Sequence, residues 1–208
     1  RSRGAVLIWT DTALYQMQFI GPPFTFGFNQ LGSACGCIGL HAAVDVGGIS
    51  FWMGTDSFFL FDGAVQKIPC TVQDYVFDDL NQNAKQDIFC AANTDYNEVM
   101  WFYPSVNSSQ IDRVVVFNYA ENLWYIGTLA RSAWSDRGTY DNPYAAEFEA
   151  SDTTATISTI TGLKAGRTFV YLHESGANDD GRAMNAHMVI NLCLSVELYQ
   201  ILNHKQEQ

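Results

Sequence analysis

The sequence predicts an all-β protein built from antiparallel hairpins and meanders, arranged as a β-propeller or part of one, with one short connecting helix. Two observations carry this prediction. Aromatic residues make up 14% of the chain and charged residues only 16%, a balance that suits the pleated faces of strands. Short apolar runs also alternate with turns rich in Gly, Asp and Asn along much of the chain.

The first hairpin is expected at the start of the chain. Ala5 to Trp9 has the composition of a strand, Thr10-Asp11-Thr12 that of a tight turn, and Ala13 to Phe19 that of the return strand. Proline cannot donate to a strand ladder. Gly21-Pro22-Pro23 and the Gly-, Ala- and Ser-rich segment from Asn29 to Gly48 are therefore expected to be long loops or edge segments.

A second hairpin extends into a three-stranded meander. Two strands, Ile49 to Met53 and Ser57 to Phe61, flank the turn Gly54-Thr55-Asp56. Asp62-Gly63 then turns the chain into a third strand from Ala64 to Ile68.

Two further hairpins follow the connecting helix. Apolar residues at helical spacing, mixed with acids, predict this helix between Thr71 and Asn83. One hairpin pairs Ile88 to Asn93 with Glu98 to Tyr103, and the other pairs Arg113 to Tyr119 with Leu123 to Gly127.

The hairpins recur at a spacing typical of propeller blades. The first three turns, near positions 11, 55 and 95, are about 40 residues apart, although the fourth turn follows too soon. Trp9, Trp52 and Trp124 lie beside turns, and Trp101 lies deeper in its strand. Radial stacking of such sheets would bury the aromatic faces that an isolated hairpin leaves in water.

The last quarter of the chain is more polar. Asp141 to Thr161 is rich in Thr, Ala and Ser, Thr168 to Leu172 is expected to be a strand, and Gly176 to Gly181 a turn. Apolar residues at every even position predict a further strand from Met188 to Leu198.

We therefore expect a propeller-like domain over residues 1–182 and a C-terminal strand or tail over residues 183–208. The chain lacks an initiator Met and opens on Arg1-Ser2-Arg3-Gly4 just before a strand, so the domain is expected to be part of a longer chain.

The charge pattern argues against two classes of partner. The net charge is −11, and no Lys or Arg occurs between Arg3 and Lys67, so a surface that neutralises phosphates is missing over almost a third of the chain. Tight nucleic-acid binding is not expected. No stretch approaches the roughly 18 consecutive apolar residues of a membrane helix, so no membrane insertion is expected.

No metal-ligating or cofactor-binding residue is predicted. His173-Glu174 resembles the start of a zinc-protease helix, but Ala177 stands where the second His is needed. The other histidines are far apart and lack Cys or carboxylate neighbours at ligand spacing, so ordinary roles are favoured for His41, His187 and His204. Reduced thiols are expected for the odd set of Cys35, Cys37, Cys70, Cys90 and Cys193.

No catalytic residue is predicted either, and the chain is not expected to be an enzyme. Asn178-Asp179-Asp180-Gly181 is interpreted as a turn because the acids that a calcium loop needs downstream are missing. The adjacent acids Asp78-Asp79 are expected to meet solvent, and Ser135 to Gly138 does not match the Asp-box of sialidase propellers. The sequence has no nucleophile elbow and no phosphate-binding loop.

Several strings taken together resemble a known family. They are Leu14 to Gln18, Gly21 to Phe24, Phe51 to Gly54, Phe61-Asp62-Gly63 through Pro69-Cys70, Asn97 to Val99, Trp101 to Pro104, Trp124-Tyr125 and Ala133 to Gly138. The chain resembles, over about residues 4–181, the packaged-DNA stabilisation or tail nozzle proteins of short-tailed bacteriophages. The segment after Arg182 departs from that pattern.

The resemblance implies a structural virion protein without catalytic residues. Members carry a β-propeller and form a six-fold ring, a homohexamer, below the portal and adaptor. The ring retains the packaged genome and conducts double-stranded DNA at ejection. The resemblance thus implies portal, adaptor and other tail subunits as partners, a place in the virion tail, and assembly in the cytoplasm of the host bacterium.

Acidity would suit such a conduit, because an acidic lumen repels phosphates and lets DNA slide with weak, non-specific contact. A role of the acidity in solubility alone stays open. So do two other functions. One is a carbohydrate- or receptor-binding propeller, whose Trp134, Tyr140 and Tyr144 would stack on sugars, and the other is a propeller glycoside hydrolase with convergent acids in a central funnel.

Overall fold

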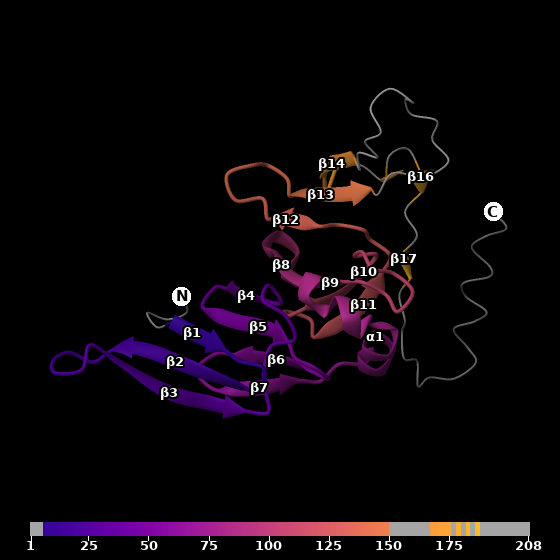
Figure 1. Ribbon diagram of the computed structural model, residues 1–208. Helices are drawn as coiled ribbons and strands as arrows, with labels where there is room; N and C mark the ends of the chain where they lie inside the picture. Colours follow the sequence, from indigo (N-terminus) through magenta and orange to yellow (C-terminus); the bar gives the residue numbers. More distant parts are fainter. Residues whose placement is uncertain (1–5, 150–166, 176–177, 180–181, 184–185, 188–208) are drawn as a thin grey trace, which may run out of the picture.

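The computed structural model describes residues 6–149, 167–175, 178–179, 182–183 and 186–187 of the chain. Within these residues the protein is mostly β, and every pair of neighbouring strands in a sheet is antiparallel. The expected class, antiparallel hairpins and meanders, is confirmed. Figure 1 shows the sheets following one another along the chain, from β1–β3 at the lower left to β12–β14 at the top.

The strands form four consecutive meanders, which we call sheets I to IV. Sheet I holds β1 (Val6–Trp9), β2 (Ala13–Phe19) and β3 (Phe26–Ser33). Sheet II holds β4 (Ala43–Val46), β5 (Ile49–Met53), β6 (Phe58–Phe61) and β7 (Val65–Ile68). Sheet III holds β8 (Phe89–Asn93), β9 (Glu98–Tyr103), β10 (Arg113–Asn118) and β11 (Leu123–Gly127), with β17 (Ala186–His187) added at the β11 edge. Sheet IV holds β12 (Ala133–Ser135), β13 (Tyr144–Glu149) and β14 (Arg167–Leu172), and β15 (Asn178–Asp179) pairs with β16 (Arg182–Ala183).

The expected hairpins are present within a residue or so of their predicted bounds, and their grouping explains the irregular spacing of the turns. The two hairpins of 88–103 and 113–127 belong to one sheet, since β9 pairs with β10 from Glu98 opposite Asn118 to Tyr103 opposite Arg113. The fourth turn therefore lies inside sheet III and does not open a new sheet.

The interpretation of Asn29 to Gly48 as a long loop is wrong for part of the segment, whereas the alternative of edge segments is confirmed. The segment holds the end of β3 and all of β4, which are the edge strands of sheets I and II. Sheet IV was likewise missed at β12 and β13. β4 has only 4 residues and β12 only 3, and each depends on pairing with a neighbouring strand.

The connecting helix is shorter than expected. Helix α1 spans Gln73–Asp79, and 3-10 helices follow at Gln82–Asp87 (η1) and Thr94–Tyr96 (η2). The helix predicted for Thr71 to Asn83 ends early because Leu80 is extended and forms a bridge with Ser105 beside β9. The strand predicted for Met188 to Leu198 lies outside the described residues, as do parts of the polar turn at 176–181.

The first strands of sheets II, III and IV lie side by side. His41, just before β4, forms a parallel bridge with Phe89 of β8, and the amide of Cys90 donates to the His41 carbonyl at 2.8 Å. β4 packs against β8, and β12 packs against β8 as well. Sheets II, III and IV thus share one inner edge within the described residues.

Apolar side chains fill each space between neighbouring sheets. Leu14, Trp52, Phe59 and Phe61 meet between sheets I and II. The largest core lies between sheets II and III and includes Phe51, Phe58, Trp101, Phe117 and Trp124. A third core lies between sheets III and IV, where Met100, Phe102 and Val114 of sheet III pack with Trp134 of sheet IV. Sheets II and III therefore bury apolar side chains on both faces, which explains their continuous hydrophobic runs.

Four tryptophans hydrogen-bond sheets II, III and IV to the preceding sheet or to a segment next to it. Trp52 of sheet II donates its indole N–H to the carbonyl of Cys35, which follows sheet I, at 2.9 Å. In sheet III, Trp101 donates to Ala42 at 3.2 Å and Trp124 donates to Pro69 at 2.8 Å, and Trp134 of sheet IV donates to Ala92 of β8 at 3.0 Å. A buried indole N–H needs such a partner, so each bond holds a sheet in one position.

We predict that Trp101→Phe destabilises the protein by about 1 kcal/mol more than Trp9→Phe, since only Trp101 loses an indole hydrogen bond. The matched control is suitable because the indole N–H of Trp9 is buried without a hydrogen-bond partner among the described residues. Urea unfolding followed by circular dichroism measures both free energies. Equal losses would mean that the lost volume, and not the hydrogen bond, sets the cost.

Candidate functional site

An open cavity of about 790 Å³ lies at the inner edge of the stack. Its walls come from the first strands of three sheets and the segments beside them. They include His41, Ala43, Phe89, Cys90, Arg131, Ala133, Trp134 and Glu147. We call this space the inner cavity. Three sheets contribute side chains to this hollow, so it is the first candidate for a binding site.

Arg131, a charged residue that lines the inner cavity, is held by several contacts within the protein. Its side chain is 3% exposed, its Nη1 lies 2.6 Å from Oε2 of Glu147, and its Nε donates to Nε2 of His173 at 3.0 Å. The guanidinium also lies over the ring of Tyr171, 4.1 Å from the centroid. A buried ion pair of this kind costs much desolvation and is retained by its hydrogen bonds. Arg131 therefore ties β12, β13 and β14 together and is already engaged within the protein.

The His173-Glu174 pair serves this same framework. His173 accepts from Arg131 at Nε2 and packs on Trp134, with ring centroids 4.6 Å apart. Glu174 accepts from Nδ2 of Asn93 at 3.0 Å. Among the described residues, no group of His, Cys, Asp and Glu is arranged to hold a metal ion. His41 contributes its backbone to the stack, and His204 lies outside the described residues.

Glu98 is the described acid whose titration is most strongly altered, and no motif in the sequence indicates it beyond the string Asn97 to Val99. Asn93 Nδ2 donates to Glu98 Oε2 at 3.2 Å, and the Tyr125 hydroxyl donates to Oε1. Burial, with the nearby carboxylate of Glu174, raises the pKa of Glu98 from 4.5 to about 7, although the Asn93 hydrogen bond opposes the change. This acid sits under the β8–β9 turn and does not line the inner cavity.

The described cysteines are free thiols in apolar surroundings. Cys35, Cys37, Cys70 and Cys90 form no disulfide, which agrees with the expected reduced state, and Cys193 lies outside the described residues. Burial raises the pKa of all four thiols, that of Cys70 to about 11. At neutral pH they hold their protons, so none has the thiolate character of a nucleophile.

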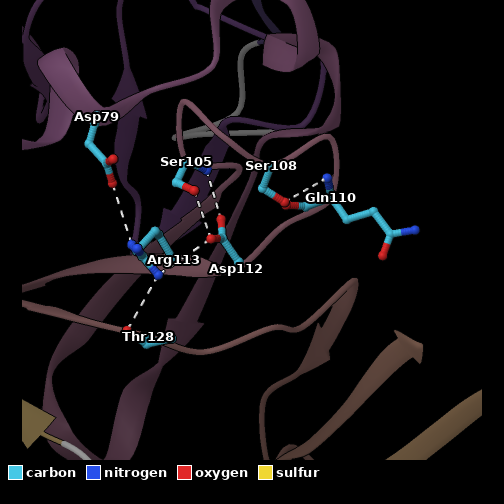
Figure 2. Close-up of polar contacts among 7 residues, drawn as sticks. All are labelled: Asp79, Ser105, Ser108, Gln110, Asp112, Arg113 and Thr128. Atoms are coloured by element: carbon cyan, nitrogen blue, oxygen red, sulfur yellow. Dashed lines mark hydrogen bonds and ion pairs between the residues drawn. The ribbon is translucent and has the colours of Figure 1, made fainter. Parts of the chain in front are cut away.

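A second polar cluster joins α1 to the loop between β9 and β10, and Figure 2 shows its members. Asp112 accepts from both the backbone N–H and the hydroxyl of Ser105 at 2.7 Å. Arg113 lies 3.3 Å from Asp112 and 3.4 Å from Asp79, and its Nη1 donates to Thr128 at 3.5 Å. The expectation that Asp78-Asp79 only meets solvent is therefore wrong for Asp79, because the loop brings a cation beside it.

The segment that fails to match an Asp-box has a structural role. The hydroxyl of Thr94 donates to Asp136 at 2.6 Å, and Arg137 lies 2.6 Å from Asp95. These contacts tie sheet IV to the β8–β9 turn. Of the aromatic residues proposed for sugar stacking, Trp134 is engaged between sheets. Tyr140 is 63% exposed and contacts Tyr144 edge to face at 5.3 Å.

Comparisons with known proteins add no family: no protein-family model matches the sequence, and no significant match is found among curated proteins. Within the described part of the chain, no helix is long and apolar enough to cross a membrane.

Glu98 predicts a pH dependence of stability. Because the folded state raises the pKa of Glu98 to about 7, the folded protein keeps a proton that the unfolded chain releases near pH 4.5. Stability should therefore decline as pH rises from about 4.5 to about 7. Glu98→Gln, which removes the charge, should stabilise the protein more at pH 8 than at pH 5, as measured by urea unfolding. Exposed Glu121→Gln is the control, and an equal effect of Glu98→Gln at both pH values would contradict the assignment.

The contacts of Asp112 predict that this cluster stabilises the fold and is not a binding site. Asp112→Ala leaves the backbone N–H and hydroxyl of Ser105, a residue only 5% exposed, without their acceptor, at a cost of about 1–3 kcal/mol. Gln110→Ala is the control in the same loop, since the Gln110 side chain points away from the cluster in Figure 2. Thermal unfolding of the two variants gives the comparison. If Asp112→Ala lowers stability no more than Gln110→Ala does, the cluster does not stabilise the fold.

Proposed function

We propose that this chain is a structural subunit of the tail of a short-tailed bacteriophage, a nozzle or hub that assembles as a six-fold ring. The ring retains the packaged DNA and passes it at ejection. The proposal rests on one observation, which is where the residues of the resembling strings lie in the fold. Trp52, Trp101, Trp124 and Trp134, one in each of four resembling strings, make the indole bonds between sheets.

The tryptophans of the resembling strings thus lie at contacts between sheets. Strings that make inter-sheet bonds belong to a framework, and no described cluster of catalytic geometry accompanies them. A resemblance carried by framework residues supports the proposal of a structural role in the same setting.

The arrangement of the sheets also supports a propeller. Blades of a propeller are antiparallel meanders whose first strands surround a common axis. Sheets II and III are four-stranded meanders, and β4, β8 and β12 lie side by side next to the inner cavity. We propose that sheets I to IV are consecutive blades and that the inner cavity is part of the axial space.

The charges favour passage of DNA over tight binding. The chain carries a net charge of −11, and Arg113, Arg131 and Arg137 are paired with acids. Acids outnumber cations by 11, and a duplex next to such a surface would meet weak repulsion over about 8 Å in physiological salt.

A carbohydrate-binding propeller is supported by one observation, the exposed Tyr140–Tyr144 pair. It is weaker than the structural proposal because Trp134, the strongest stacking group of the three, is engaged in the stack. For a hydrolase, the inner cavity offers Asp87 and Glu147, but Glu147 is ion-paired with Arg131. A glycan array separates the sugar-binding alternative from the structural role.

The tail role predicts where the chain is found. Antibodies against the purified chain should label the tail of short-tailed particles encoded by the same genome, in immunogold electron microscopy, and averaged images of these tails should show a six-fold ring. Particles without label, or a chain that is monomeric inside labelled particles, would overturn the proposal. Antibodies against a capsid protein of the same particles provide the control for labelling.

A further inference from the structure

Two carboxylates from different sheets meet at one buried amide. Asn93 ends β8 and is 1% exposed, and its Nδ2 donates to Oε2 of Glu98 at 3.2 Å and to Oε1 of Glu174 at 3.0 Å. Glu98 lies opposite Asn93 in the β8–β9 ladder, whereas Glu174 follows β14 of sheet IV. The two carboxylate oxygens that share this nitrogen are therefore no more than about 6 Å apart, a separation at which like charges oppose each other's ionisation.

Glu174 is fixed to sheet IV, so its contact with Asn93 joins two sheets. Its backbone carbonyl accepts from Nδ2 of Asn142, which lies just before β13, at 3.0 Å. Its side chain reaches the end of β8, next to the Ala92 carbonyl that accepts from the indole of Trp134. The acid pair and this indole therefore lie at the same border between sheets III and IV.

Neither carboxylate of the pair is ion-paired with a cation in the described part of the chain. Tyr125 of β11 donates its hydroxyl to Oε1 of Glu98, and Asn118, opposite Glu98 on β10, carries no charge. Arg137, the cation that reaches the same turn, lies 2.6 Å from Asp95. The other ionisable groups that sheet IV brings toward this border are bonded to other residues, and they are Arg131, Asp136, Glu147 and His173.

The acid pair is more stable with a proton than without one. With one carboxyl protonated, the pair carries a single negative charge, and one amide nitrogen can serve both groups. Release of that proton to solvent leaves two negative charges on one buried donor, which costs both desolvation and repulsion. Burial, together with the Glu174 carboxylate, raises the pKa of Glu98 to about 7, so this change falls near neutral pH.

We propose that Glu98, Asn93 and Glu174 form a proton-dependent latch, which holds sheet IV on sheet III below neutral pH and weakens as the pH rises above it. The latch is a property of the single chain and does not rest on the tail role. Its sign follows from linkage, because a carboxyl that keeps its proton longer in the folded state stabilises that state less as the pH rises. His173 has the opposite sign, since its protonation would remove the acceptor of the Arg131 Nε–H and loosen sheet IV as the pH falls.

Indole hydrogens report whether this border opens. The Trp134 indole is bonded across the border to Ala92, whereas that of Trp101 is bonded to Ala42 beside sheet II. Exchange of both indole hydrogens with water is measured by NMR on the isotope-labelled chain at pH 6 and pH 8.5, and the ratio of the two rates cancels the intrinsic effect of pH on indole exchange. We expect the Trp134 to Trp101 ratio to rise about tenfold, the change that a single pKa unit of coupling between the carboxylates gives. Trp134→Phe and Trp101→Phe assign the two signals.

Conservative variants separate the latch from a general effect of pH. Glu98→Gln and Glu174→Gln each remove one charge but keep an oxygen for the Asn93 amide, so each should abolish the rise. Glu174→Ala removes the contact itself and should give the higher ratio at both pH values. Asp136→Asn is the matched control, because Asp136 bonds the same turn through Thr94, and it should leave the rise in place. Circular dichroism checks that each variant is folded at both pH values, and either Gln variant alone is sufficient for the test.

Three outcomes would overturn the proposal. A ratio that is the same at pH 6 and pH 8.5 in the original chain means that the acid pair does not control the border. A rise that persists in the Gln variants assigns the pH dependence to another group. A ratio that falls as the pH rises points to His173 in place of the acid pair. None of these outcomes changes the expected labelling of tails, so the latch and the tail role fail separately.

Discussion

The packing of one sheet on the next through a tryptophan is the interaction on which the rest of this structure depends. An indole supplies a large apolar surface and one hydrogen-bond donor, so it can fill the space between two sheets and also satisfy a backbone carbonyl at their border. Trp101 does both, since it packs on Phe58 at 4.8 Å and donates to Ala42. Apolar packing alone would let two sheets slide, whereas the hydrogen bond selects one position.

The polar groups are arranged around these contacts and have mostly structural partners. Arg131, Arg113 and Arg137 each lie against a carboxylate that belongs to a different strand or helix. The chain as a whole still carries a net charge of −11, and this acidity is the electrostatic property that a partner would meet.

The sequence predicted the parts of the fold that local chemistry determines. Turn residues and β-favouring runs located β2, β5 and β9, whose bounds were expected correctly. Strands β4, β12 and β13 were not located, because Ala43–Val46 and Ala133–Ser135 are runs of only 4 and 3 residues that become strands through pairing with a neighbouring strand. Glu98 was missed because tertiary contacts determine its titration. Its pKa depends on burial and on Glu174, which is remote in the chain, and no local spacing reveals either.

The stack has a thermodynamic consequence, because the apolar cores of the described residues lie between consecutive sheets. Stability in such an arrangement is close to a sum of local terms and nearest-neighbour terms, as in linear repeat proteins. Sheets II and III each gain two neighbour terms, while sheet I, with its projecting β2–β3 hairpin, gains one. Cooperativity should therefore decrease toward the ends, so that sheet I exchanges its amide hydrogens through local opening long before the centre unfolds.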